Sequence, residues 1–387
     1  MKRNLHALAW SAALVFAPQA VPAAAPLSTS SVLVQYADIV HATYDDSLRL
    51  ATVMQQAIDE FIARPSAVTL QAAQKAWLEA REPYVQSEAF RFYGGPIDGE
   101  NGPEARINAW PMDESYVDSV KGRPDAGLIN DPRFVINRSN VIAQNERGGE
   151  ENIASGWHAI EFLLWGQDFN DDGPGNRSYT DFVDGAAPNA DRRRQYLKVI
   201  TDLLVDDLAG LAREWKAGRK ANYRAQFEKG GVESVRKIFV GLGSLSRGEL
   251  AGERMEVALA SQDQEDEHSC FSDNTHRDIV NDALGIENVW LGRYKRADGT
   301  VLQGPSLRDL VAKEDPALAE RTTQQIAKSV ALARAIQPPF DREIVGGRDA
   351  AGRKRIQMAV DSLVQQSKDL VDSAAALGIK RLTLVTP

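Results

Sequence analysis

Apolar residues recur along this chain mainly at intervals of three, four or seven positions, the spacing of amphipathic helices. One such stretch runs from Val32 to Ile62 and ends before Pro65. A second runs from Ser66 to Phe92, where Gly and Pro follow. Since Pro cannot donate a backbone hydrogen bond, Pro65 marks a break between two predicted long helices.

The same periodicity predicts further helices, at residues 150–165, 191–215, 232–261, 276–294, 306–336 and 352–377. Between positions 97 and 147, Pro and Gly divide the chain into short helices and loops. Alternating patterns typical of strands are scarce. The sequence therefore predicts an all-α protein.

The best internal boundary is the turn-rich segment 166–190, which contains two groups of Gly and Pro. We expect two antiparallel helical bundles, at residues 30–175 and 190–387. Residues 156–162 and 248–254 share Gly, Ala and Glu at matching offsets, so an internal duplication is an open alternative.

The first residues are typical of a secretory signal peptide, which we place at 1–24. Lys2 and Arg3 precede a short apolar run from Leu5 to Phe16, and a small-residue stretch follows. The run is too short to span a bilayer, and no later stretch has about 18 uninterrupted apolar residues. We expect a protein of the periplasm or cell envelope, or alternatively an extracellular one, without a transmembrane segment after signal removal.

Composition narrows the class of protein. The 387 residues carry a formal net charge of -9, which argues against a nucleic-acid partner, because phosphate binding requires a basic face. The single cysteine, Cys270, excludes a disulfide framework and a Cys-rich metal site, and we expect it to be buried and inert. An acidic surface is compatible with attracting cations.

The most informative candidate site is His158-Ala-Ile-Glu161. A three-residue offset places the imidazole and the carboxylate on one helical face, where they can bind one cation. Apolar neighbours predict deep burial, and a buried carboxylate needs a metal ion, an arginine or a hydrogen-bond network as partner. Gly156 leaves room for a close backbone approach. The alternative is a core histidine bonded to a neighbouring glutamate.

A second candidate face carries Trp77, Arg81, Tyr84 and Glu88, at offsets of four, seven and eleven. Such a face is too polar for ordinary core. It can supply a third metal ligand, Glu88, surrounded by Arg81, Tyr84 and Trp77. The alternative is an ion pair within the helix, covered by aromatic packing.

Residues 263–278 combine several carboxylates with two histidines. Further metal ligands from the second half of the chain would be Glu253, His268, Asp273 and His276. Ser272 or Asp273 also suits the N-cap of the following helix, and this structural interpretation is the favoured one. Signatures of zincins, α/β-hydrolases, P-loop proteins, dinucleotide-binding proteins and c-type haem proteins are absent from the sequence.

The sequence resembles the imelysin-like proteins, also called peptidase family M75 and iron-regulated protein A-like. Residues 156–161 match the GxHxxE signature of that family, and the face from Trp77 to Glu88 matches as well. Residues 249–255 and 267–276 resemble the iron-regulated subgroup. The resemblance covers essentially the whole mature chain.

This resemblance implies two related helical bundles with a functional site where they meet, in an exported bacterial protein of iron acquisition. It places His158 and Glu161 in that site. We favour a metal-binding protein that takes iron, as an ion or a chelate, and passes it to a membrane uptake system.

Two alternatives stay open. The same pair can hold zinc in a metallopeptidase, although such a site needs three protein ligands, an open position and a base. The chain can also be a non-catalytic helical module that binds a ligand or partner. Whether the protein is an enzyme is not decided by the sequence.

Overall fold

A computed structural model describes residues 27–170 and 173–385, so the predicted signal peptide lies outside the described residues. The described chain is helical apart from loops and one two-stranded antiparallel sheet. The predicted all-α class with two bundles is confirmed. None of the helices in these two ranges combines the length and apolar character that a membrane crossing needs.

The elements of the first half are α1 (Thr29–Ala63), α2 (Ala67–Gln86), the 3-10 helix η1 (Ser87–Phe90), α3 (Glu104–Ile107), α4 (Glu114–Val117), α5 (Arg138–Gln144), α6 (Trp157–Trp165), the 3-10 helix η2 (Tyr179–Phe182) and α7 (Ala190–Trp215). The elements of the second half are α8 (Tyr223–Phe227), α9 (Val232–Ser244), the π-helix η3 (Leu245–Glu256), α10 (Val257–Ser261), the 3-10 helix η4 (Gln264–Asp266), α11 (Thr275–Leu291), β1 (Arg293–Lys295), β2 (Val301–Gln303), α12 (Leu307–Glu314), α13 (Pro316–Ala333), α14 (Asp341–Ile344) and α15 (Ala351–Ala376).

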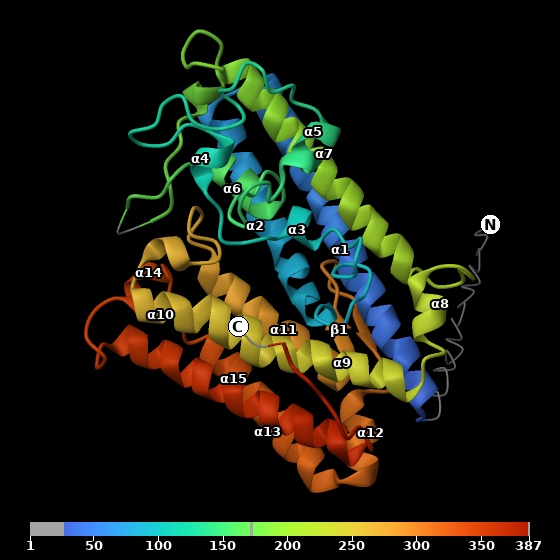
Figure 1. Ribbon diagram of the computed structural model, residues 1–387. Coiled ribbons are helices and arrows are strands. Elements are labelled where there is room, and N and C mark those ends of the chain that lie inside the picture. The colour runs from blue at the N-terminus through green and yellow to red at the C-terminus, as the bar shows by residue number, and fades with distance from the viewer. Residues whose placement is uncertain (1–26, 171–172, 386–387) are drawn as a thin grey trace, which may run out of the picture.

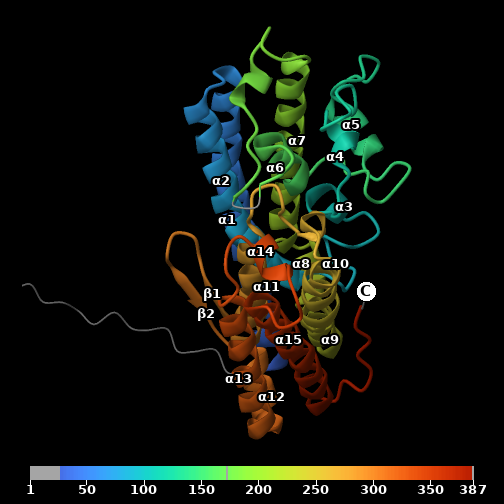
Figure 2. The same cartoon turned by 90° about the vertical axis from the view of Figure 1, so that its left-hand side faces the viewer.

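The first bundle is built on α1, with α2 and α7 packed along it and α6 between α2 and α7 (Figure 1). In the second bundle, α15 packs against α13, α9 and η3, and α11 packs against α13. Helix α11 also packs against α2, so it joins the two bundles (Figure 2).

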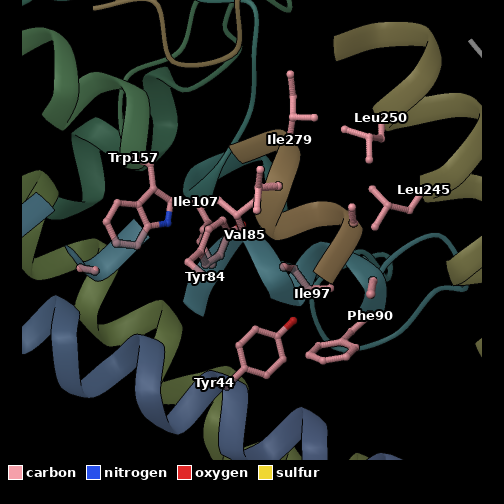
Figure 3. Packing of buried hydrophobic residues seen from close by; sticks show 14 of the residues in the cluster. Tyr44, Tyr84, Val85, Phe90, Ile97, Ile107, Trp157, Leu245, Leu250 and Ile279 are labelled. Carbon is pink, nitrogen blue, oxygen red and sulfur yellow. The ribbon is translucent and has the colours of Figure 1, made fainter. Parts of the chain in front are cut away.

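One continuous apolar core connects the halves. Val85 of α2 and Phe90 of η1 gather with Leu245 and Leu250 of η3 and Ile279 of α11 (Figure 3). All five are buried. We call the region where the two bundles meet, around α2, η1, η3 and α11, the junction. Polar groups there lie in a low-dielectric environment, where each needs a partner.

The long periodic helices α1, α7 and α15 match their predicted ranges closely. Ser28 and Ser66 begin α1 and α2, each with a side chain that accepts a backbone N–H in a capping box. The second predicted helix continues to position 90, but its last turn is the tighter η1.

The helix predicted from position 150 is wrong at its start, because α6 begins only at Trp157. Gly156 has a φ of 92°, outside the helical region. A Cβ at this position would lie 2.5 Å from the carbonyl oxygen of Ile107. The predicted close backbone approach at Gly156 is therefore confirmed. The same close contact explains why α6 begins later in the chain than predicted.

Two other predicted helices are also corrected. The helix predicted over 306–336 is split before Pro316, where Asp315 caps α13 by accepting from the Leu318 N–H at 2.9 Å. The helix predicted over 276–294 ends at Leu291, because Gly292 takes a left-handed conformation and β1 follows.

Candidate functional site

Helix α6 places His158 and Glu161 side by side in the core. Both side chains are buried, and His158 Nδ1 lies 3.0 Å from Glu161 Oε2. The second carboxyl oxygen, Oε1, accepts the Ser272 N–H at 3.0 Å and the Ser272 hydroxyl at 2.7 Å. Helix α6 therefore presents an imidazole whose orientation is set by a carboxyl group that the second bundle holds in place.

Burial governs the charge of this pair. It raises the pKa of Glu161 to about 8, against the opposing effects of Ser272 and Arg81. Burial also lowers the pKa of His158, and the nearby Arg81 guanidinium lowers it further. At neutral pH the imidazole is therefore uncharged.

The other ring nitrogen of His158 has no hydrogen-bond partner among the described residues, although it is buried. The ring packs against Trp110, with centroids 4.9 Å apart, and against His268, with centroids 4.7 Å apart. A buried polar atom without a partner costs about 1–3 kcal/mol. His158 Nε2 is thus the atom of this pair that a ligand would satisfy.

A buried ion pair next to the histidines joins the bundles. Arg81 of α2 donates to Asp278 of α11, with Nη2 2.9 Å from Oδ2 and Nε 3.2 Å from the same oxygen. Ser269 and Asn274 donate to Asp278 as well, at 2.7 and 3.1 Å. Although burial raises the pKa of Asp278, the Arg81 guanidinium holds it well below its usual range. Asp278 is therefore charged.

His268 lies against this ion pair. Its Nε2 is 3.5 Å from Arg81 Nη2, and its Nδ1 is 3.3 Å from Asp278 Oδ2. Burial, together with Arg254, lowers the pKa of His268 to about 3. Two neutral imidazoles, one from each half of the chain, therefore meet at the junction.

The predicted face on α2 surrounds Arg81 with aromatic rings. The guanidinium carbon lies 5.7 Å from the Trp77 ring centroid, 5.6 Å from that of Tyr84 and 5.8 Å from that of Trp157. Trp77 Nε1 donates to the Trp157 carbonyl at 3.1 Å, which ties α2 to the start of α6.

Glu88 lies at the far end of the same polar network. It accepts from Arg91 and, at 3.4 Å, from Asn108 Nδ2. Asn108 Oδ1 in turn accepts from Arg81. The Glu88 carboxylate is therefore already engaged by a guanidinium and an amide.

A cavity of about 450 Å³ opens beside Asn108 and Trp110, between the bundles. Its charged lining consists of Glu104, Glu146, Glu150, Glu249, Glu253, Asp266, Arg91 and Arg254. In the described ranges, four of the carboxylates engage no other side chain: Glu146, Glu150, Glu253 and Asp266. The cavity therefore carries an excess of negative charge contributed by both halves.

The metal ligands predicted in the second half of the chain do not all lie at the same place. His268 reaches the junction and Glu253 lines the cavity. Half-buried His276 directs Nδ1 to the Asp273 carbonyl at 3.1 Å. Burial, with neighbouring Asp168 and Asp341, raises the pKa of Asp273 to about 7. Across residues 27–170 and 173–385, no three His, Cys, Asp or Glu side chains converge as a ready set of metal ligands.

Sequence reasoning missed Asn108, Trp110, Ser272 and Asp278 as members of the junction. Asn108 and Trp110 come from a loop without periodicity, so no sequence signal marked them. The predicted cap by Ser272 or Asp273 is wrong, because the N-cap of α11 is Asn274 and the Ser272 hydroxyl binds Glu161 instead. Cys270 is buried as predicted, and burial raises the pKa of its thiol.

The fold and this junction define an all-helical protein in which two bundles enclose a buried His–Glu pair and an adjoining acidic cavity. The sequence model of the Imelysin family, Peptidase_M75, matches residues 40–370. The chain belongs to this family.

Known relatives agree with this assignment. The chain is 25% identical over 359 residues to a protein named iron-regulated protein A from Synechococcus elongatus, covering 89% of this chain and 87% of that one.

Two crystal structures share the fold. One is from Parabacteroides distasonis, of a protein described as a candidate iron-regulated protein A precursor, with a TM-score of 0.72 and 20% identity over 90% of this chain and 94% of that one. The other is an imelysin-like protein from Psychrobacter arcticum, with a TM-score of 0.65 and 15% identity over 93% of this chain and 99% of that one.

Proposed function

We propose that this protein binds iron, as an ion or a chelate, in the periplasm or cell envelope and passes it to a membrane uptake system. The observation that carries the proposal is His158 Nε2, a buried imidazole nitrogen without a partner among the described residues, beside a cavity with unpaired carboxylates. The Synechococcus elongatus relative is named as iron-regulated, and we propose iron as the cargo for that reason.

The acidic cavity is suited to the first encounter with a cation. Its lining has more carboxylates than guanidinium groups, so the local potential concentrates cations there. Glu146, Glu150 and Glu253 are exposed, so these side chains are free to rearrange around an ion. Carboxylate oxygens suit iron, manganese and zinc, and geometry decides among them.

Trp110 links the cavity to His158. Its side chain lines the cavity and packs against the imidazole, so a rotation of this ring would open a path between them. Glu161 contacts Nδ1, so Nε2 is the nitrogen available to a metal. A cation at Nε2 would favour the ionised Glu161 carboxylate, which would then accept the Nδ1 proton and orient the imidazole. Because no ready set of three ligands exists in the described chain, iron binding must draw carboxylates toward His158.

Calorimetric titration of the purified protein with iron and with zinc tests this proposal. We expect His158→Ala to weaken iron binding by about tenfold or more, since ligand-orienting changes alone cost 10–100-fold. Glu253→Gln combined with Glu150→Gln should weaken it less. His41→Ala, a partly exposed histidine on α1, is the matched control. Equal affinity of all four proteins would refute iron binding at the junction.

The zinc-dependent peptidase remains the alternative, and it is supported by the label of the family. Metal-loaded protein is incubated with an unstructured polypeptide, beside Glu161→Gln as control. Cleavage by the wild type that the variant lacks would favour the peptidase.

Export is proposed from the sequence of residues 1–24. N-terminal sequencing of the mature protein from envelope fractions tests it. We expect the chain to begin after Ala23 or Ala24.

A further inference from the structure

One end of the molecule carries a group of exposed cations. The connection between α7 and α8, with the end of α8, contributes Lys216, Arg219, Lys220 and Lys229 (Figure 1). Within the described residues, none of these four side chains lies within ion-pair distance of a carboxylate. Together with Val34 of α1, they line a cavity of about 610 Å³. We call this region the basic end.

Three carboxylates near the basic end are already engaged. Asp38 and Glu228 both accept from the buried Arg224, at 2.7 and 2.6 Å. Glu214 accepts the Tyr223 N–H at 2.9 Å. With Arg224 included, this region has five cations against these three carboxylates, so its local charge is positive although the whole chain has a formal charge of -9.

A second hollow, of about 370 Å³, lies next to the basic end. Its lining combines apolar side chains, among them Leu27, Val232 and Val235, with the polar residues Ser28, Thr29, Lys313 and Glu314. The two hollows are near each other in the chain, because Val34 follows Thr29 by five residues on α1 and Val232 follows Lys229 by three. Val232 is 60% exposed, Val34 38% and Leu27 37%. Unpaired cations and exposed apolar side chains therefore occur together at one end.

We propose that the basic end docks on the surface of a bilayer that contains anionic phospholipids. The lysine and arginine side chains contact lipid phosphates, and the exposed valines and Leu27 enter the boundary between headgroups and acyl chains. Each Lys or Arg near such a surface contributes about 1 kcal/mol, and a second, apolar contribution is what makes such attachment stable.

The combination of unpaired cations and exposed apolar side chains favours a lipid surface over a free phosphate or an acidic peptide. A free phosphate or a purely acidic peptide would contact the cations but leave the exposed side chains of Val232, Val34 and Leu27 uncovered. In Figure 1, α8 is well separated from α6, so docking at the basic end leaves the junction and its cavity accessible. The proposal does not depend on iron binding.

Vesicle co-sedimentation of the full mature chain tests the proposal. We expect binding to phosphatidylglycerol-containing vesicles, no binding to pure phosphatidylcholine vesicles, and weaker binding as salt increases. The test variant combines four substitutions: Lys216→Gln, Arg219→Gln, Lys220→Gln and Lys229→Gln. It should reduce the affinity for the anionic vesicles at least about tenfold. Val232→Ser should reduce it less.

A control variant removes the same charge elsewhere, at exposed positions of the first bundle: Lys75→Gln, Lys121→Gln, Arg133→Gln and Arg147→Gln. We expect it to bind the vesicles like the wild type. Circular dichroism and thermal denaturation establish that each variant is folded. Equal vesicle binding by the two variants would overturn the proposal. Binding of the wild type to polyglutamate but not to vesicles would also overturn it, in favour of an acidic protein partner.

Discussion

The junction and the basic end use charged side chains in opposite ways. Arg81 is buried and bound by Asp278, whereas Lys220 is exposed and has no carboxylate within reach in the described chain. In the low-dielectric junction each charge depends on its partner, so the pairing fixes how the bundles meet. At the solvent-exposed basic end, the cations together produce a positive electrostatic potential, and no single one of them defines the fold. Basic residues therefore fix the packing of the two bundles at the junction, whereas at the basic end they attract anions.

The largest expected effect is the loss of Asp278. Asp278→Ala leaves the Arg81 guanidinium buried without its carboxylate, which should destabilise the protein by about 3–5 kcal/mol. Chemical denaturation measures this loss. Asp372→Ala, which removes an exposed partner of Arg321, should cost about 1 kcal/mol or less. Equal losses would show that the junction is not the more sensitive region.

Gly156 should be the next most sensitive position. Gly156→Ala forces a side chain into a φ of 92° and against the Ile107 carbonyl, at a cost of about 1–3 kcal/mol. Gly185→Ala shares a positive φ of 78° but meets no atom within 4 Å. Thermal denaturation should therefore show a smaller loss for Gly185→Ala. A reversed order would contradict the role of the close approach.

Acid should weaken the junction through its buried histidines. The pKa of His268 is lowered to about 3 in the fold, while the unfolded chain takes up a proton below about pH 6.5. Stability is therefore lost as the pH falls from about 6.5 toward 3, by about 1.4 kcal/mol per pH unit for this group.

His268→Gln should flatten that decline in denaturation curves recorded across this pH range. Burial also lowers the pKa of half-buried His41, so His41→Gln serves as a control that should change the decline less. An unchanged slope in His268→Gln would mean that other groups govern the acid response.

The smallest effect is expected at the basic end. Lys220→Gln removes an exposed charge without a partner in the described chain, so the free energy of unfolding should change by about 0.5 kcal/mol or less. The same denaturation measurement checks this. A loss comparable to that of Asp278→Ala would remove the contrast between the two regions.

The local pattern of apolar residues predicted much of the secondary structure of this protein. Helices α1, α7 and α15 follow long, regular apolar stripes, and a regular stripe specifies a helix wherever it packs. The side-by-side placement of His158 and Glu161 needed only a three-residue offset on a helix. The start of α6 was missed, because it depends on the Ile107 carbonyl, which the end of α3 places against Gly156.

The sequence by itself determined the helical class, the long helices and the buried His–Glu pair, because these depend on periodicity and on neighbours within a few residues. Only the tertiary structure decided that Asp278 would neutralise Arg81, that Ser272 would hold Glu161, and that His268 would pack against His158. Such contacts join residues far apart in the chain. Their geometry follows from how the two bundles pack, and no local spacing records it.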